Sequence, residues 1–270
     1  MSLHIKSPGE APGVYPIVKR GKGLKHLSFT VVRLGGGFRE YSFESGEEEL
    51  SLDSYSGPAR VEVEHAGGRW AAEFPPRLSL AEAAPMIYLP AGSRVQLTAL
   101  DGSAHLSIGG ALGKSGAQPA LIQGDRILRS VVGKGTYSRL VLTHIGADID
   151  AARLIAGETI STGNWSSFPP HKHDRLAPPS ECPMEEVYYF LIEPPDGFSF
   201  IRVYTGAGDP DPFDCAFAVE HGDTILIPRG YHPVATCPGY NLNYTWVLAG
   251  EGRTYGAWSD DPRYSWIRQL

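Results

Sequence analysis

Short apolar runs, bounded by glycine, proline or aspartate, recur along the whole chain. They are rich in β-branched and aromatic residues, and this spacing predicts the strands of a β-sandwich or barrel. We expect strands at residues 27–34, 59–66, 86–92, 94–100, 138–145, 186–193, 198–205, 215–220, 223–228 and 242–250. Helical periodicity is weak, and residues 148–157 are interpreted as a short helix or a lead-in to a strand.

Two segments of the chain have matching sequence patterns. "APMIYLPAGSRVQL" (84–97) contains Pro-x-Gly-x-Arg, and "GDTILIPRGYHPV" (222–234) contains Pro-x-Gly-x-His, so that Arg94 falls where His232 stands. Glutamate pairs also enter a strand at corresponding places upstream in both halves. The match predicts a duplicated β unit, with Arg94 as a structural or surface residue, because a guanidinium stays protonated and cannot ligate a metal.

Composition narrows the class of protein. The 270 residues include 32 glycines and 22 prolines, which favours β structure with many turns. We expect two domains, residues 1–145 without a metal site and residues 146–270 with one. The net charge is −6 and no basic block occurs, so neither a nucleic-acid surface nor an anionic membrane surface is expected.

Cysteine usage and hydropathy suggest a compartment. The three cysteines lack CxxC spacing, so neither a disulfide framework nor a thiolate zinc site is expected. No apolar run reaches the roughly 18 residues that a membrane span needs. These features favour a protein of the reducing cytoplasm, with a small-molecule partner. A homo-oligomer is left open.

The stretch "WSSFPPHKHD" (165–174) carries the most specific chemistry. On a strand, His171 and His173 would share a face and could bind one atom. Two carboxylates, Glu185 and Glu186, stand at the head of the next predicted strand, and His232 follows a Pro-x-Gly turn. Three imidazoles and one carboxylate suit Zn²⁺, Mn²⁺, Fe²⁺ or Ni²⁺ and leave positions open for substrate oxygens.

The order HxH…E…PxGxH is that of the cupin superfamily, and the resemblance goes further. "GNWSSFPPHKHD", "EEVYYF" and "GDTILIPRGYHPVATCPGYNLNYTWVLAG" resemble the bacterial 5-deoxy-glucuronate isomerases of inositol catabolism over residues 150–260, with weaker similarity in the first half. The resemblance implies an all-β bicupin fold, two tandem jelly-roll-like barrels, in a cytoplasmic enzyme. The family's metal ligands fall on His171, His173, Glu186 and His232.

Two departures from the general cupin pattern bear on the carboxylate ligand. Twelve residues separate His173 from Glu186, and the last histidine follows Pro-x-Gly after one residue rather than two. Glu186 is preferred because it directly precedes Val187, where cupin strands carry the ligand, and because it would share a face with Tyr188. Glu185 would then point away or support the ligands from behind.

The resemblance implies that one divalent metal ion, Zn²⁺ or Mn²⁺ before Fe²⁺ or Ni²⁺, assists conversion of 5-deoxy-D-glucuronate to 5-dehydro-2-deoxy-D-gluconate. The expected catalytic residues are Glu185, Arg202 and Tyr188. Arg202 would bind the substrate carboxylate, and the base is left open among Glu185, Asp174 and a tyrosine. Lys172 is expected to point away from the histidines, as a solvated or loop-pairing bystander. The alternatives are a ketol-isomerase of 4-deoxy-5-hexosulose-uronate, a non-catalytic sugar-binding cupin and a cupin dioxygenase.

Overall fold

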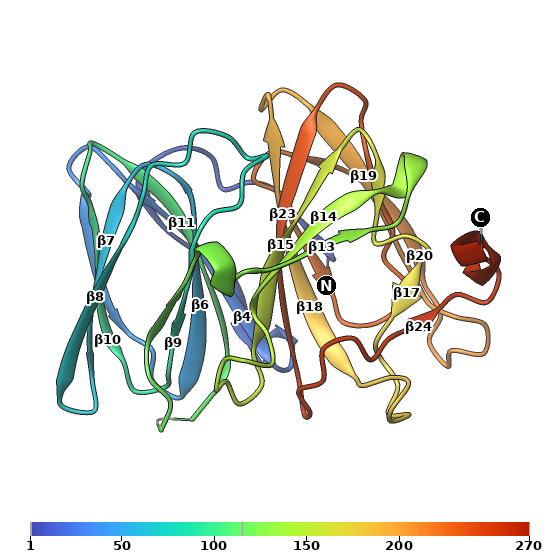
Figure 1. Cartoon of the computed structure of the whole chain (residues 1–270), viewed down its shortest axis with the longest axis horizontal. Helices are drawn as coiled ribbons and strands as arrows, with labels where there is room; N and C mark the ends of the chain where they lie inside the picture. The colour runs from blue at the N-terminus through green and yellow to red at the C-terminus, as the bar shows by residue number, and fades with distance from the viewer. Residues whose placement is uncertain (1, 115, 270) are drawn as a thin grey trace.

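The computed structural model describes residues 2–114 and 116–269, which form two double-sheet units side by side (Figure 1). Strands account for nearly all regular structure, and no α-helix occurs among the described residues. Three short 3₁₀ helices are present, η1 (Gly124–Arg126), η2 (Gly135–Tyr137) and η3 (Ser265–Gln269). The predicted all-β architecture is confirmed. No helix in the described part of the chain is long and apolar enough to cross a membrane.

The N-terminal unit has a seven-stranded and a four-stranded sheet. The larger sheet has the order β12 (Ala120–Ile122), β9 (Met86–Leu89), β6 (Glu48–Ser56), β11 (Ala104–Leu112), β4 (Leu27–Leu34), β2 (Gly13–Arg20) and β3 (Gly23–Leu24). The smaller sheet has the order β5 (Glu40–Glu44), β10 (Arg94–Ala99), β7 (Ala59–His65) and β8 (Gly68–Phe74).

The C-terminal unit repeats this plan. Its larger sheet has the order β1 (His4–Ile5), β21 (Thr224–Ile227), β18 (Met184–Glu193), β23 (Asn241–Gly250), β15 (Ile155–Thr162), β14 (Arg139–Ile145) and β13 (Leu128–Val132). Its smaller sheet has the order β16 (Trp165–Ser166), β22 (Val234–Thr236), β19 (Phe198–Tyr204) and β20 (Asp214–Glu220). The corresponding strand orders support the duplication inferred from the two Pro-x-Gly phrases.

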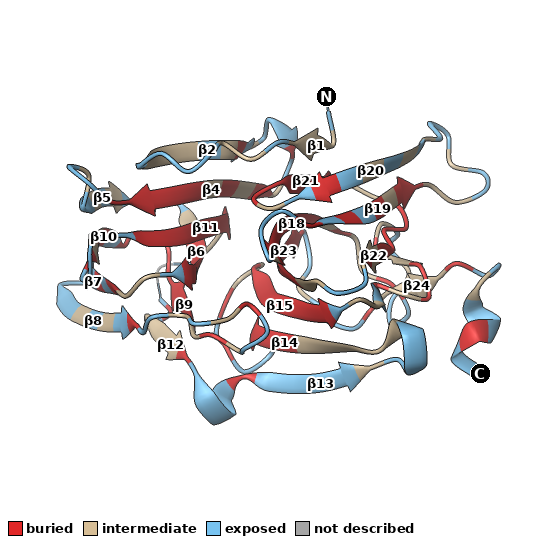
Figure 2. Cartoon of the chain, turned by 90° about the horizontal axis from the view of Figure 1, so that it is seen from above, coloured by how far each residue is buried: buried red, intermediate tan, exposed pale blue. Residues whose placement is uncertain are grey.

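The boundary predicted after residue 145 does not coincide with the change of sheet. Strands β13 and β14, which precede the predicted boundary, pair with each other in the C-terminal sheet. Strand β14 also pairs with β15, which follows that boundary. Strand β1, at the start of the chain, also pairs with β21 of that sheet (Figure 2). The C-terminal sheet therefore takes strands from both sides of the predicted boundary.

Three clusters of buried apolar side chains account for the apolar sequences of the strands. One fills the N-terminal unit, one fills the C-terminal unit, and the third lies between the two large sheets. In β18, Tyr188 and Phe190 belong to the C-terminal cluster, whereas Val187 and Tyr189 belong to the cluster between the sheets. A strand covered on both faces has no solvent side, and its sequence reads as a continuous apolar run. Figure 2 shows these buried strands at the centre of the molecule.

The two large sheets approach closely at Gly109 in β11. A Cβ atom there would lie 2.9 Å from the Cγ atoms of Val247 in β23 and 2.7 Å from Ser51 Oγ. Glycine is therefore required by this contact between the two units. The same glycines weaken the β signal of "AHLSIGGAL", and this strand was not among those expected from the sequence. Residues 148–157 contain no helix, and the lead-in interpretation holds because β15 begins at Ile155.

A buried polar network also joins the two units. The Tyr55 hydroxyl of β6 lies 2.6 Å from Ser107 Oγ and 2.8 Å from Thr245 Oγ1 of β23. Thr245 donates to Asp53 Oδ2 over 2.6 Å. Buried polar groups need such partners because water cannot reach them. The interface is therefore specified by hydrogen bonds as well as by apolar packing.

Candidate metal centre

Three predicted ligands meet inside the C-terminal unit. One ligand atom each from His173, Glu186 and His232 lies within 4.8 Å of the others, and all three side chains are buried. Glu186 Oε2 is 3.2 Å from His173 Nε2 and 3.3 Å from His232 Nε2. Two imidazoles and a carboxylate converging on one point form a donor set suited to a divalent metal ion.

His171 lies beside this trio but outside its tightest grouping. Its ring centroid is 4.8 Å from that of His232 and 6.3 Å from that of His173. It stands in β17 (His171–Lys172), which pairs with β24 (Ser259–Asp260) near the end of the chain. All four predicted ligands thus gather in one region, and His171 lies beside the trio whose ligand atoms are within 4.8 Å of one another.

Backbone carbonyls orient two of the imidazoles. His173 Nδ1 is 2.8 Å from the carbonyl oxygen of Met184, and His232 Nδ1 is 2.9 Å from that of Gly230. A carbonyl can only accept, so each Nδ1 carries the hydrogen. Nε2 of His232 is then free to present a lone pair, whereas Nε2 of His173 is hydrogen-bonded to Glu186 Oε2. His232 Nε2 is buried and has no hydrogen-bond partner. An orphaned buried acceptor of this kind fits a metal ligand.

The protonation of the histidines agrees with ligation. Desolvation lowers the pKa of His171 well below its ordinary value, and the neighbouring histidines lower it further. Burial lowers the pKa of His232 to about 4, against the opposing charge of Glu186. Burial also acts to lower the pKa of His173, but the hydrogen bond with Glu186 outweighs it and the pKa is raised. At neutral pH, His171 and His232 are therefore uncharged, the form that binds metal.

Of the two alternatives expected for Lys172, solvated or loop-pairing, the structure shows the second. Its ammonium group pairs with Asp174 and lies 2.8 Å from Glu181 Oε1, and Glu181 is fully buried. Asp174 Oδ2 in turn accepts the backbone N–H of Gly230 over 2.8 Å, two residues before His232. The pairing forms because the twelve-residue segment after His173 folds back and brings Glu181 to the lysine. Lys172 thereby ties the HxH segment to the loop that carries the third histidine.

The alternation of β18 separates the two glutamates. Glu186 faces the interior with Tyr188, as expected from the sequence. Glu185 faces the opposite side, where its two carboxylate oxygens accept the backbone N–H groups of Lys25 and His26 over 2.8 and 2.7 Å. The catalytic role expected for Glu185 does not fit this placement, since its carboxylate bridges to the N-terminal unit and is not among the residues that line the cavity at the metal centre.

A cavity of about 230 Å³ opens onto the cluster. The residues lining it are Ser130, Val132, Arg139, Val141, Thr159, Ser167, His171, His173, Met184, Glu186, Tyr188, Tyr244, Trp246, Leu248, Tyr255 and Trp258. Its size suits a small molecule, with apolar and aromatic walls around a few polar groups.

Tyr188, expected to be catalytic, lines this cavity, with its ring centroid 5.7 Å from that of His232. Arg202, the expected carboxylate clamp, does not line it. Its guanidinium lies on the exposed side of β19 and forms a two-bond ion pair with Asp214, with distances of 2.8 and 2.5 Å. The expectation for Arg202 does not fit because this mid-strand charge faces outward rather than into the barrel.

The cavity residues that sequence reasoning missed include Arg139, Tyr255 and Trp258. Arg139 opens the apolar run "RLVLTHI" of β14, and a charge inside such a run was the available signal. Tyr255 and Trp258 follow the last long strand, in a segment without a motif. Trp258 packs beside His171, with ring centroids 5.4 Å apart.

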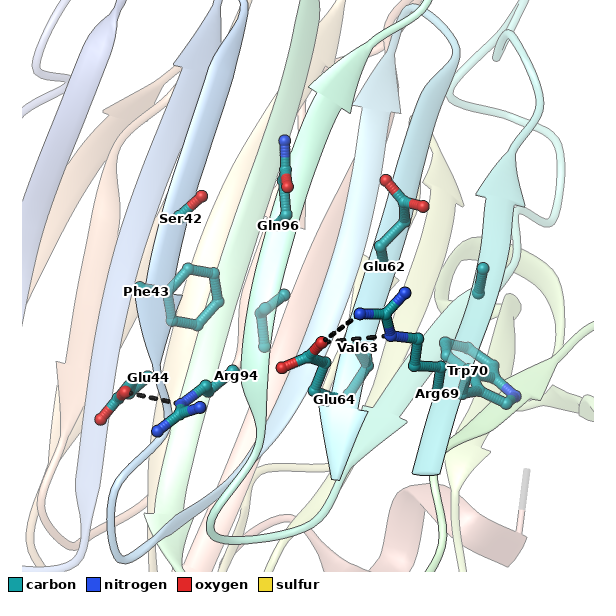
Figure 3. Close-up of a pocket in the computed structure, with 12 residues that line it drawn as sticks. Ser42, Phe43, Glu44, Glu62, Val63, Glu64, Arg69, Trp70, Arg94 and Gln96 are labelled. Atoms are coloured by element: carbon teal, nitrogen blue, oxygen red, sulfur yellow. Dashed lines mark hydrogen bonds and ion pairs between the residues drawn. The ribbon is translucent and has the colours of Figure 1, made fainter. Parts of the chain in front are cut away.

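A larger hollow, of about 700 Å³, lies on the small sheet of the N-terminal unit (Figure 3). Its charges are exposed and paired across strands, Arg94 with Glu44 over 3.0 Å and Arg69 with Glu64 over 3.1 Å. No histidine or cysteine lines it, among the described residues. Arg94 is therefore a surface residue, as expected. It stands at the position that corresponds to His232 and forms a cross-strand ion pair with Glu44.

Comparison with known proteins agrees with this geometry. Residues 3–267 match the KduI/IolB family. The chain belongs to the KduI/IolB family. It is 32% identical over 266 residues to the 5-deoxy-glucuronate isomerase of Geobacillus thermodenitrificans (strain NG80-2), covering 97% of this chain and 94% of that one. It is 42% identical over 142 residues to the enzyme of the same name from Listeria monocytogenes serotype 4a (strain HCC23), covering 51% and 50%.

Solved structures show that this family member has the cupin fold. An IolB-like protein from Salmonella typhimurium LT2 superposes with a TM-score of 0.89 at 30% identity, covering 99% of this chain and all of that one. The oxalate decarboxylase of Lactobacillus farciminis superposes with a TM-score of 0.69 at 12% identity, covering 100% and 91%. The second likeness concerns the fold alone. The expected bicupin fold and the resemblance to the isomerase family are both confirmed.

Proposed function

We propose that this protein is a metal-dependent aldose–ketose isomerase that converts 5-deoxy-D-glucuronate to 5-dehydro-2-deoxy-D-gluconate. The observation that carries the proposal is the convergence of His173, Glu186 and His232, two of which, His173 and Glu186, also line a small-molecule cavity. Its support from comparison is that relatives named 5-deoxy-glucuronate isomerase match over nearly the full length of both chains.

The ligands would be the trio together with His171. The donor set fits a borderline divalent ion, Zn²⁺ or Mn²⁺ first and Fe²⁺ or Ni²⁺ next, because it combines neutral imidazoles with one carboxylate and no thiolate. When bound, such an ion supplies Lewis acidity that polarises a carbonyl and stabilises negative charge developing on oxygen. This is the chemistry that proton transfer between neighbouring carbons of a sugar requires.

Tyr188 is assigned the role of hydrogen-bond donor to a substrate oxygen. Burial raises the pKa of Tyr188 well above its ordinary value, and the charge of Glu186 raises it further. The phenol therefore keeps its proton at neutral pH and can donate a hydrogen bond where charge develops. Tyr244 lies next to it, with ring centroids 4.6 Å apart, and closes the apolar wall behind it. Together these rings exclude water from the reacting carbons.

The test is an isomerase assay on protein with measured metal content. We expect turnover of 5-deoxy-D-glucuronate, followed by nuclear magnetic resonance, to disappear on chelation and to return with Zn²⁺ or Mn²⁺. The second substrate to assay is 4-deoxy-5-hexosulose-uronate, and a preference for it would reassign the substrate. Full activity of metal-free protein would contradict the metal-dependent mechanism. Sugar binding without turnover would indicate a non-catalytic cupin, and oxygen consumption with iron would indicate a dioxygenase.

A further inference from the structure

A single arginine lines the cavity of the metal centre. Arg139 is the first residue of β14, and its side chain shares the cavity wall with His171, Glu186 and Tyr188. Lysine and other arginines are absent from the described residues that form this wall. The site therefore combines a cluster of metal-ligand type with one fixed positive charge.

The guanidinium of Arg139 keeps free hydrogen-bonding capacity. Its Nη1 donates to the carbonyl oxygens of Tyr137 and Phe168 over 3.1 and 2.8 Å. No carboxylate in the described chain lies within ion-pair distance of it, in contrast to Arg202 with Asp214 and the buried Arg77 with Glu158. Nε and Nη2 therefore remain available, and a largely buried charge without an acidic partner is costly unless a ligand supplies one.

The charge of Arg139 influences the pKa of two tyrosines that line the cavity. Burial lowers the pKa of Arg139 from its ordinary value, but an arginine this basic stays protonated. Its charge acts against the burial-driven rise in the pKa of Tyr188 and Tyr244. The cation and the phenols thus share one low-dielectric space, where an anion would be strongly attracted.

We propose that Arg139 binds the carboxylate of the sugar-acid substrate and so selects uronates against uncharged aldoses. This inference rests on the proposed isomerase function. A guanidinium can donate two parallel hydrogen bonds to one carboxylate, which fixes both the position and the rotation of that end of the substrate. The carboxylate lies at the opposite end of the hexose chain from the two carbons that exchange a proton. Arg139 therefore replaces Arg202 as the clamp.

Arg139 positions the substrate in this proposal and takes no part in the proton transfer. Removing its charge should therefore raise KM more than it lowers kcat. For Arg139→Gln we expect KM for 5-deoxy-D-glucuronate to rise roughly 10- to 150-fold, the range for losing a hydrogen bond to a charged group. Arg139→Lys keeps the charge without the paired donors and should fall between. The matched control is Arg129→Gln, at an exposed arginine of β13 that is not part of the cavity wall.

The decisive comparison pairs the acid with 5-deoxy-D-glucose, which carries a hydroxymethyl group in place of the carboxylate. Wild type and Arg129→Gln should prefer the acid strongly, whereas Arg139→Gln should lose most of that preference. An unchanged preference in Arg139→Gln would overturn the proposal, and a lost preference in Arg202→Gln would return the role to Arg202. If Arg139→Gln does not fold, Arg139→Lys is measured instead, and full wild-type preference there would overturn the proposal.

A binding measurement separates this inference from the function itself. Calorimetric titration with D-gluconate, which has the carboxylate but no carbonyl to isomerise, needs no turnover. We expect binding to wild type and Arg129→Gln, and weakening of at least about tenfold in Arg139→Gln with metal content unchanged. Equal binding to Arg139→Gln, or none to wild type, would contradict the carboxylate role. Absence of isomerisation with normal gluconate binding would remove the proposed function and leave Arg139 as an acid-binding residue.

Discussion

At the scale of single residues, the candidate metal centre depends on hydrogen bonds that orient the histidine rings. The Gly230 and Met184 carbonyls hold Nδ1 of His232 and His173, so that both Nε2 atoms face Glu186. Such partners behind the ligands fix the tautomer and the ring orientation. Because the buried His232 Nε2 has no hydrogen-bond partner, His232 is the residue of the cluster that most strongly indicates a metal ligand.

We expect His232→Ala to lose metal binding, because it removes one of three convergent donors and leaves a cavity in a buried site. The expected fall in metal affinity exceeds the roughly 10- to 100-fold loss typical of removing a supporting partner. Metal content after dialysis, measured by mass spectrometry, checks this. His26→Gln is the control, since that side chain lies near Glu251 and does not line the cavity. Retention of one bound metal per chain in His232→Ala would contradict the assignment.

The placement of Glu185 leads to a second prediction at this scale. Glu185→Gln should leave turnover within about threefold of wild type, because the carboxylate lies outside the cavity. It should lower the free energy of unfolding by about 1.5–3 kcal/mol, since two backbone N–H groups share its charge. Denaturant titration and steady-state kinetics measure both. Turnover that is lost almost completely, with stability unchanged, would restore Glu185 as the base.

At the scale of elements, strand periodicity accounts for much of what the sequence predicted. The alternation of β18 explains why Glu186 and Tyr188 face the cavity together, and this was predicted from their spacing. The segment between β17 and β18 has no such period, so the partners of Lys172 were not predictable. Its ion pairs with Asp174 and Glu181 form only when that segment folds back.

Lys172→Met tests this connection between elements. It removes the ammonium and leaves Glu181 buried beside Asp174, and breaking a buried ion pair in this way costs about 3–5 kcal/mol of stability. We also expect metal affinity to fall by at least about tenfold, because Asp174 anchors the loop before His232. Arg94→Met, which breaks an exposed cross-strand pair, should cost about 0–1 kcal/mol. Equal stability losses in the two variants would contradict a structural role for Lys172.

At the scale of the whole molecule, the two units meet through an apolar layer that contains ionisable groups. Burial and, after it, the charge of Glu158 raise the pKa of Asp53 to about 8, against the opposing effect of Arg77. Asp53 therefore holds a proton in the folded protein that it loses in the unfolded chain at the same pH. The interface between the units thus couples folding stability to pH.

The sign of this coupling is opposite to that of an ordinary ion-paired carboxylate. A raised folded-state pKa contributes stability that is complete below about pH 4, the unfolded value, and is lost as pH rises through about 8. Compared with Asp53→Asn, wild type should lose up to ~1.4 kcal/mol of unfolding free energy per pH unit within this window. Denaturant titrations of both proteins between pH 5 and 9 measure the difference. Parallel pH profiles would exclude Asp53 as the titrating group.

The sequence by itself predicted the β content, the duplication and the three residues of the candidate metal centre that the structure brings together, His173, Glu186 and His232, because strand period and motif order are properties of the chain. Tertiary structure decided which charges meet. It turned Glu185 towards Lys25 and His26, paired Arg202 with Asp214 on the surface, and brought Arg139 to the cavity from a strand about thirty residues before the HxH motif. The physical reason is that a charged side chain in a strand pairs with residues of other sheets and loops. These partners are distant in sequence, so the local residue pattern does not identify them.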